Sequence, residues 1–182
     1  MKISKFIRNK IMILIPILLL LFLCIFSAIY ILQKRNPNET PSALLNKKLP
    51  SFSTKSLYNE YVNLSSDNLK KKYTLINFFA SWCAPCKIEH PLFFILSDDF
   101  PDLFLLGINY KDKKEDAINY LNEDGNPYNF IGVDKEGKLG LEFGVIGLPE
   151  TFIINNEGKI IYKHLGPLSK KIIENEIKPF LQ

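Results

Sequence analysis

Hydrophobic residues occur in one long uncharged stretch near the N-terminus and in several short runs further along the chain. Residues 11–32, with the sequence IMILIPILLLLFLCIFSAIYIL, contain 22 positions without a charged side chain. A helix of ~20 apolar residues is long enough to cross the ~30 Å hydrocarbon core of a bilayer. A cleavable signal peptide is the competing interpretation, but its apolar region is usually shorter and ends at a small-x-small site. The pattern favours an uncleaved transmembrane helix at 11–32, preceded by a tail at 1–10.

A polar segment separates this stretch from the short hydrophobic runs. Residues 33–50 contain three prolines and are typical of a linker. The runs that follow predict strands at 52–65 (a weakly alternating pair), 73–80, 103–110 and 150–164 (a hairpin with its turn at 155–158). Helices are predicted from Cys83 to about Asp98, over 112–125 with Asp112 as the cap, and from Ser169 to the C-terminus.

The order of these elements predicts a single α/β domain over residues 51–182. The first strand–helix–strand unit requires a parallel crossover, and the later hairpin adds antiparallel strands. The sheet should therefore be mixed, with helices on both faces, which is the plan of the thioredoxin-like fold. A fold class by itself defines no function.

Charge is distributed unevenly along the chain. Six of the 23 basic residues lie within residues 1–35, and all 19 acidic residues come later. From residue 36 onward, 17 lysines stand against 19 acidic residues, a formal charge of −2. The basic balance of the whole chain therefore comes from the flanks of the hydrophobic stretch and does not indicate a nucleic-acid-binding surface.

The flanking charges also predict an orientation for the hydrophobic stretch. Four basic residues precede it and two follow it closely: Lys2, Lys5, Arg8 and Lys10, against Lys34 and Arg35. By the positive-inside rule the tail stays in the cytoplasm and the rest of the chain is exported. In a bacterial cell this predicts a single-pass inner-membrane protein whose domain faces the periplasm, where disulfides persist.

Two of the three cysteines, Cys83 and Cys86, lie in FFASWCAPCKIEHP at a predicted strand-to-helix junction, while Cys24 lies inside the hydrophobic stretch. A disulfide across three residues constrains the unfolded chain very little, so a structural clip is a poor explanation. At a helix N-terminus a thiolate is favoured over a thiol, which makes Cys83 the candidate nucleophile. Cys86 follows one turn later as the resolving thiol. Ala84 and Pro85 between them set the stiffness of the loop.

A metal site is the alternative interpretation of two cysteines at this spacing. A closed zinc site needs four ligands, and beside the pair the exported part of the chain offers only His90 and His164. His90 is expected on the surface of the helix that follows the cysteines. A copper-binding thioredoxin-fold chaperone is the second alternative. The cysteine pattern of that family resembles C-x-x-x-C, and the spacing here is one residue shorter.

Three stretches of the chain resemble the membrane-anchored DsbE/CcmG thiol:disulfide proteins of cytochrome c maturation. They are FFASWCAPC, LLGINYKDKKEDAINYLNEDGNPY and GLEFGVIGLPETFIINNEGKIIYKHLGPL, and the similarity runs from about Ser42 to Phe180. The resemblance implies a reductant without a cofactor, acting on the disulfide in the haem-binding C-x-x-C-H segment of apocytochrome c. A membrane thiol transporter of the DsbD/CcdA type would re-reduce it. Contact with a haem-ligation complex, and a more general role as an exported disulfide reductase or oxidant, stay open.

The resemblance also assigns residues around the cysteine pair. Pro149 is expected to form a cis peptide bond facing the pair, with Leu148 leaving its backbone free for an extended substrate peptide. Trp82, from its position directly before the nucleophile, is expected to line the substrate groove, with an ordinary core residue as the alternative. Glu89 and Glu150 match the acidic residues of the family, and a negative charge near a thiolate raises the pKa of the thiol, which suits a reductant. Two ordinary surface carboxylates are the alternative interpretation of these acids.

Overall fold

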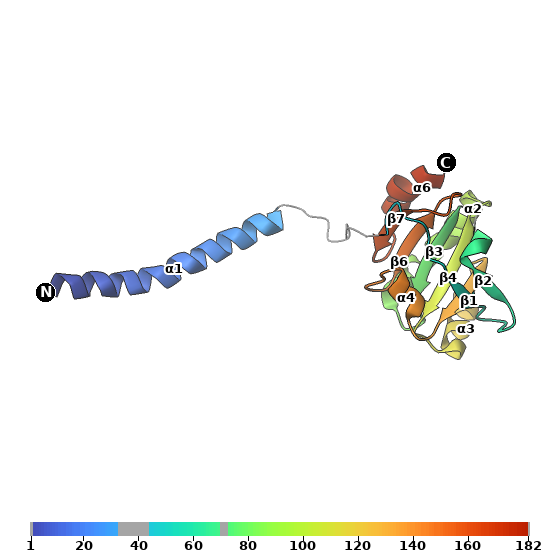
Figure 1. The fold of residues 1–182 in the computed structure, drawn as a ribbon, viewed down its shortest axis with the longest axis horizontal. Coiled ribbons are helices and arrows are strands. Elements are labelled where there is room, and N and C mark those ends of the chain that lie inside the picture. The colour runs from blue at the N-terminus through green and yellow to red at the C-terminus, as the bar shows by residue number, and fades with distance from the viewer. Residues whose placement is uncertain (1, 33–43, 70–72, 182) are drawn as a thin grey trace. The chain divides into compact units, whose positions relative to one another are not determined.

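The computed structural model describes residues 2–32, 44–69 and 73–181, and the chain divides into two compact units, 1–37 and 38–182. In the first unit α1 (Lys2–Leu32) is a single helix that contains Pro16 (Figure 1). Among the residues whose side chains the structure describes, no helix combines the length and the apolar character that crossing a membrane requires.

The second unit is an α/β domain. Its strands are β1 (Ser53–Lys55), β2 (Asn63–Ser65), β3 (Thr74–Phe79), β4 (Phe104–Tyr110), β5 (Phe130–Asp134), β6 (Glu150–Ile154) and β7 (Ile160–Leu165). Its helices are η1 (Ser66–Leu69), α2 (Ala84–Asp99), α3 (Lys114–Glu123), α4 (Lys138–Glu142), α5 (Lys170–Ile172), η2 (Ile173–Ile177) and α6 (Lys178–Leu181).

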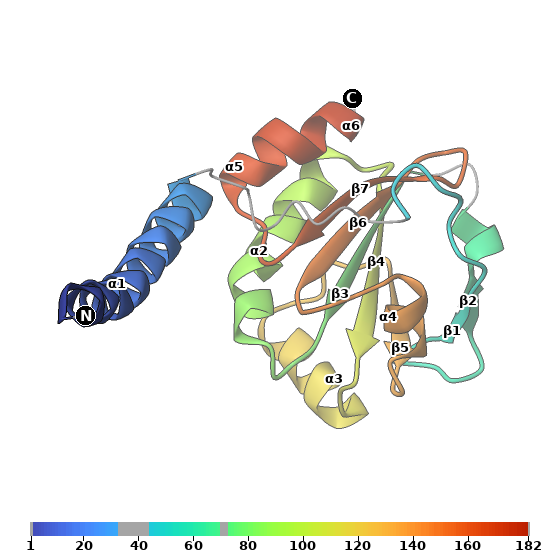
Figure 2. The same ribbon diagram turned by 60° about the vertical axis from the view of Figure 1, so that its left-hand side comes forward.

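The main sheet is mixed, as the sequence predicts. Its strand order is β5-β4-β3-β6-β7. β3, β4 and β5 are parallel to one another, while β6 and β7 are antiparallel to their neighbours. Figure 2 shows α2 and α3 on one side of this sheet and α4 with the small β1–β2 sheet on the other. This is the thioredoxin-like fold.

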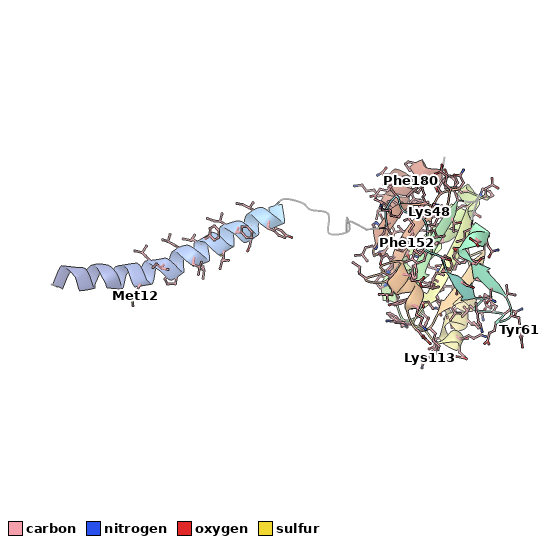
Figure 3. The ribbon with its side chains drawn as sticks, in the orientation of Figure 1. Met12, Lys48, Tyr61, Lys113, Phe152 and Phe180 are labelled. Atoms are coloured by element: carbon pink, nitrogen blue, oxygen red, sulfur yellow. A yellow bond between two sulfur atoms is a disulfide. The ribbon has the colours of Figure 1, made fainter. Side chains whose placement is uncertain are left out.

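Central strand β3 separates two hydrophobic cores. Its side chains alternate, so that Leu75 and Phe79 pack with α2, α3 and the C-terminal helices, while Ile76 and Phe78 pack with α4 and the β1–β2 segment. Phe152 of β6 lies inside the second core (Figure 3). Every residue of β3 is buried, which explains why its sequence lacks a polar face.

The hydrophobic pattern did not predict β5, α4 or the short 3-10 helix η1. A glycine interrupts both β5 and α4, which weakens the local signal for a strand or a helix. A Cβ at Gly132 in β5 would approach the Thr54 side chain to 2.4 Å, and one at Gly140 in α4 would approach the Tyr110 ring to 2.3 Å. Close packing against neighbouring segments therefore requires glycine at both positions.

The predicted C-terminal helix is present, with a π-helical turn (η2) between α5 and α6. Ser169 caps its start, because the hydroxyl Oγ accepts a hydrogen bond from the backbone N–H of Ile172 at 3.3 Å. Ile173 and Ile177 are buried in the core beneath it. The sequence predicts residues 46–49 as part of the linker. In the structure they form backbone hydrogen bonds with the β6–β7 hairpin.

Candidate active site

Cys83 and Cys86 form a disulfide at the N-terminus of α2, with a Cα–Cα separation of 5.3 Å. The sheet places them there because β3 ends at Phe79 and the backbone N–H of Cys83 donates to the carbonyl of Ala80 at 3.1 Å. Cys83 is the N-cap residue, and its Sγ accepts a hydrogen bond from the backbone N–H of Cys86 at 3.2 Å. Pro85 lies in the first helical turn, where its missing N–H is no loss.

Trp82 forms the exposed edge of the site, with 61% of its surface accessible. Its indole Nε1 donates to the carbonyl oxygen of Lys111 at 3.2 Å, which ties the cysteine loop to the end of β4. Asp112 strengthens this link, because its carboxylate accepts from the backbone N–H of Ser81 at 2.6 Å and from the Ser81 hydroxyl at 2.9 Å.

The role predicted for Asp112 as a helix cap is therefore wrong. α3 begins at Lys114 with Lys113 as its N-cap residue, and the Asp112 carboxylate turns to Ser81 instead. A signal for this role existed in the sequence. The carboxyl ends of the parallel strands β3 and β4 meet at one edge of the sheet, so polar residues that follow them should lie close together.

A cis peptide bond joins Leu148 to Pro149 immediately before β6. Glu150, the residue after the proline, pairs with Phe78 of β3, so the turn lies at the end of β3 that leads to the cysteines. The Pro149 carbonyl accepts from the backbone N–H of Gly166 at 2.9 Å. Ile146, three residues before the proline, exposes 67% of its surface.

Glu89 is fully buried in α2, which rules out the interpretation of a surface carboxylate. Its Oε1 accepts from Asn77 Nδ2 at 2.8 Å, and its Oε2 accepts from the backbone N–H of Leu168 at 2.7 Å. Burial in the core raises the pKa of Glu89 to about 7, and the two hydrogen bonds partly offset that effect. A carboxyl group that titrates near neutral pH thus lies three residues after Cys86, on the same side of the helix.

Glu150 is also fully buried, but on the other face of the sheet. It pairs with Phe78 across the strands, whereas the adjacent pair, Thr151 with Asn77, faces Glu89. The Glu150 carboxylate forms a buried ion pair with Lys163 at 2.6 Å and accepts from the backbone N–H of Ile146 at 3.0 Å. Its charge is therefore neutralised within the fold, unlike that of Glu89.

His90 is buried at 2% exposure, so the expectation of a helix-surface residue is wrong. α3 and the segment after it cover this side of α2, and the His90 ring packs 4.9 Å from the Tyr120 ring. Its Nε2–H donates to the Gly125 carbonyl at 2.9 Å, and burial lowers the pKa of the imidazole. Within the described residues no group of three or more His, Cys, Asp and Glu side chains is arranged to hold a metal ion.

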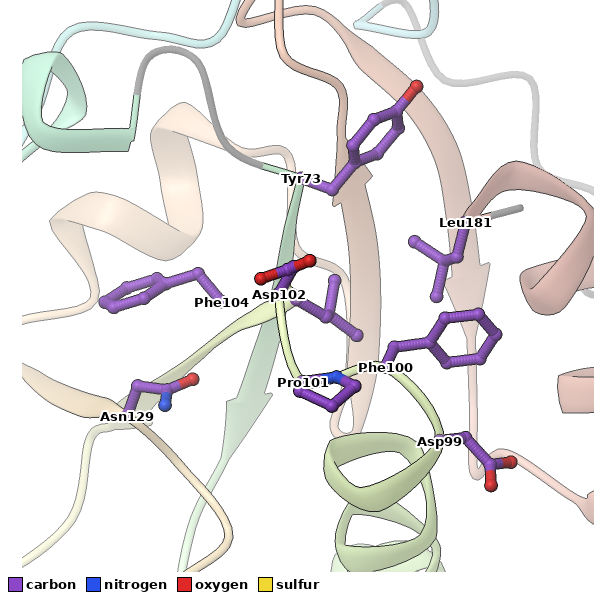
Figure 4. Close-up of a pocket in the computed structure, with 9 residues that line it drawn as sticks. Tyr73, Asp99, Phe100, Pro101, Asp102, Phe104, Asn129 and Leu181 are labelled. Carbon is purple, nitrogen blue, oxygen red and sulfur yellow. The ribbon is translucent and has the colours of Figure 1, made fainter.

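One pocket lies away from this site. It has a volume of about 850 Å³ and is lined by Tyr73, Phe104 and Leu181 among others (Figure 4). Tyr73 and Phe104 mark the amino ends of β3 and β4, whereas the disulfide follows the carboxyl end of β3. The pocket is therefore at the opposite end of the sheet from the redox pair.

A disulfide that caps a helix directly after a buried parallel strand, beside a cis-proline turn, defines a thioredoxin-like thiol-disulfide oxidoreductase. The redoxin family model matches residues 44–178. The chain is 40% identical over 167 residues to the thiol:disulfide interchange protein DsbE of Escherichia coli K12, covering 88% of this chain and 89% of that protein. It is 38% identical over 152 residues to the thiol:disulfide interchange protein HelX of Rhodobacter capsulatus, covering 84% and 85%.

Among solved structures, a Chlorobium tepidum protein assigned as a thiol:disulfide interchange protein DsbE superposes with a TM-score of 0.67 at 23% identity. The match covers 76% of this chain and 98% of that one. This chain belongs to the redoxin family and, within it, to the DsbE-type thiol:disulfide interchange proteins.

Proposed function

We propose that this protein reduces the disulfide in the haem-binding C-x-x-C-H segment of an apocytochrome c, so that haem can attach. The observation that carries the proposal is the buried Glu89 carboxyl one turn below Cys86. A negative charge there disfavours a thiolate, so the reduced pair gives up its electrons more readily. Similarity to thiol:disulfide interchange proteins supports the exchange chemistry itself.

The exchange proceeds in two steps, each of which conserves electrons. The Cys83 thiolate attacks one sulfur of the substrate disulfide, forming a mixed disulfide while the other substrate sulfur leaves as a thiolate. The Cys86 thiolate then attacks the Cys83 sulfur and releases the second substrate sulfur. The substrate gains two electrons and ends as a dithiol, and Cys83 and Cys86 end as the disulfide found in the structure.

Local contacts support the assignment of Cys83 as the attacking residue. Its sulfur caps α2 and accepts the backbone N–H of Cys86. A thiolate at this position gains both from that hydrogen bond and from the helix dipole. Trp82, Leu148 and Ile146 are the apolar side chains proposed to contact a substrate peptide.

The proposal includes an inner-membrane anchor at residues 11–32 with the domain facing the periplasm. Its support is the 22-residue uncharged stretch in the sequence, which lies within α1, and the excess of basic residues before it. On this topology electrons would reach the domain from a membrane thiol transporter of the DsbD/CcdA type. A haem-ligation complex would be the neighbouring partner that uses the reduced apocytochrome.

The experiment that tests this function is deletion of the gene, followed by staining of membrane and periplasmic fractions for covalent haem. Loss of stained cytochromes, restored by the wild-type gene but not by a Cys83→Ser variant, is the expected result. Normal haem staining in the deletion strain, with other exported proteins left in the wrong disulfide state, would instead indicate a general exported reductase or oxidant.

A further inference from the structure

Three buried polar side chains from three different segments form a chain of hydrogen bonds that ends on Glu89. The Tyr128 hydroxyl donates to Asn77 Oδ1 at 2.9 Å. Asn77 Nδ2 donates to Glu89 Oε1 at 2.8 Å and to Thr151 Oγ1 at 3.2 Å. Tyr128 comes from the connection between α3 and β5, Asn77 from β3 and Glu89 from α2, so the hydrogen bonds link three separate segments.

These contacts fix which way the Asn77 carboxamide points. Its oxygen is occupied by the Tyr128 hydroxyl, and its two N–H groups are directed at Glu89 and Thr151. The reversed carboxamide would place its oxygen against the Glu89 carboxylate and its N–H groups against the Tyr128 hydroxyl. Asn77 is 1% exposed and cannot form a compensating hydrogen bond with bulk water. The reversed carboxamide would therefore cost about 1–3 kcal/mol.

The sheet leaves room for the Tyr128 ring at one position in β4. A Cβ on Gly107 would approach the rings of Phe79 and Tyr128 to 2.9 and 3.0 Å. The two rings stack with their centroids 5.1 Å apart, which holds the Tyr128 hydroxyl over Asn77. Glycine at position 107, in the middle of a buried strand, therefore leaves the space that the Tyr128 ring occupies.

We propose that Tyr128 and Asn77 are positioning residues of the redox site: the Tyr128 hydroxyl keeps the Asn77 carboxamide turned with its N–H toward Glu89, which holds the ionised carboxylate beneath Cys86. The inference rests on the proposed role of Glu89 in tuning the cysteine pair. Without the hydroxyl, the Asn77 carboxamide is free to reverse. Its oxygen can then accept a hydrogen bond from the protonated Glu89 carboxyl group. Loss of the hydroxyl should thus favour the protonated form of Glu89 at a given pH.

The groups that can influence this equilibrium come from the elements packed around Glu89. On α2 itself Cys86 is held in the disulfide and does not titrate in the oxidised protein. Tyr120 on α3 has a pKa raised by burial, so it stays uncharged over the range in which Glu89 titrates. The segment after β7 contributes the backbone N–H of Leu168, and β3 contributes the neutral Asn77. Tyr128 has a pKa far above its usual value because it is buried, so it stays protonated and acts as a donor throughout the neutral range.

The test is an NMR titration of the oxidised full-length protein in detergent, with ¹³C-labelled glutamate side chains. The Glu89 carboxyl resonance is identified as the one that disappears in Glu89→Gln. Tyr128→Phe should move its titration midpoint upward by ~0.5 pH unit or more, since one hydrogen bond is worth about 1 kcal/mol. Asn77→Leu, which removes the donor itself, should move the midpoint upward by at least as much.

Tyr120→Phe is the matched control, because the buried Tyr120 hydroxyl has no hydrogen-bond partner among the described residues. It should leave the midpoint where the wild type has it. Equal midpoints in wild type and Tyr128→Phe would overturn the inference, as would an equal shift in Tyr120→Phe. An upward shift with an unchanged dependence of the reduction potential on pH would support the positioning role while refuting the proposed tuning by Glu89.

Discussion

The Lys163 ammonium lies 2.6 Å from the Glu150 carboxylate, with the two side chains 8% and 0% exposed. Lys163 Nζ also donates to the Gly144 carbonyl at 2.9 Å, and Glu150 accepts from the N–H of Ile146. The pair therefore holds residues 144–146, just before the cis-proline turn. We interpret Glu150 as a residue that fixes the segment before the cis-proline, and Glu89 as the acid whose charge acts on the cysteines.

Breaking this buried pair should destabilise the domain strongly. Lys163→Met leaves the Glu150 carboxylate buried without its partner, which is expected to lower the free energy of unfolding by about 3–5 kcal/mol. Urea unfolding at pH 7 measures the loss. Lys159→Met is the control, because Lys159 pairs with Glu157 on the surface and such a pair contributes at most about 1 kcal/mol. Similar losses in the two variants would contradict the interpretation.

Glu89 should make the stability of the protein depend on pH. Its pKa is about 7 in the folded protein and near the ordinary value of 4.5 in the unfolded chain, so the folded state binds the extra proton between these pH values. Stability from this group is full below pH 4.5 and is lost as pH rises through about 7, a change of about 3 kcal/mol. The difference in unfolding free energy between wild type and Glu89→Gln, measured from pH 4.5 to 8, isolates this contribution from that of His90. A difference in unfolding free energy that does not change with pH would contradict the burial of an ionisable Glu89.

The two acids should differ in their effect on the redox pair. Glu89→Gln is expected to raise the reduction potential by about 10–30 mV at pH 8, because the variant removes a negative charge near the thiolates. At pH 6 wild-type Glu89 is largely protonated, so the shift should shrink. Glu150→Gln should give a smaller shift at both pH values, because Lys163 already compensates its charge. Equal shifts in both variants, or a shift for Glu89→Gln that ignores pH, would refute this division of roles.

The orientation of the chain in the membrane can be measured with a reporter enzyme that is active only in the periplasm. Fused after Gln182 it should be active, since the basic residues before the hydrophobic stretch keep the tail in the cytoplasm. The same reporter fused before Met1 serves as the control and should be silent. Activity of the N-terminal fusion together with silence of the C-terminal one would reverse the proposed orientation.

Much of the fold is predictable from sequence because its central segments carry strong local signals. The all-apolar run of β3 and the turn at residues 155–158 both match the structure, with Gly158 in the left-handed region at φ 73°. β5 is not predictable in this way, since Gly132 is present to admit Thr54 from a segment far away in the sequence. Such a glycine weakens the local strand pattern while serving the tertiary packing.

The candidate site likewise contains residues that the local sequence predicts and residues that only tertiary packing places. The cysteines and Trp82 belong to one short motif, and their placement at a strand-to-helix junction follows from the local pattern. The burial of Glu89 and His90 does not, because it depends on α3 and on the segment after β7 packing over α2. Asn77 and Tyr128 were missed for the same reason. They lie 51 residues apart, and only the folded sheet brings the hydroxyl to the amide.

The most direct test of the central claim is to trap the mixed disulfide. In Cys86→Ser the attack by Cys83 can proceed, but release is blocked, so the substrate stays covalently attached to Cys83. Acid-quenched cells expressing this variant are run on a non-reducing gel, with Cys83→Ser as the matched control, and the partner is identified by mass spectrometry. We predict an apocytochrome c in the Cys86→Ser adduct and no adduct with Cys83→Ser. An adduct formed by Cys83→Ser, or Cys86→Ser adducts that contain no cytochrome, would contradict the account.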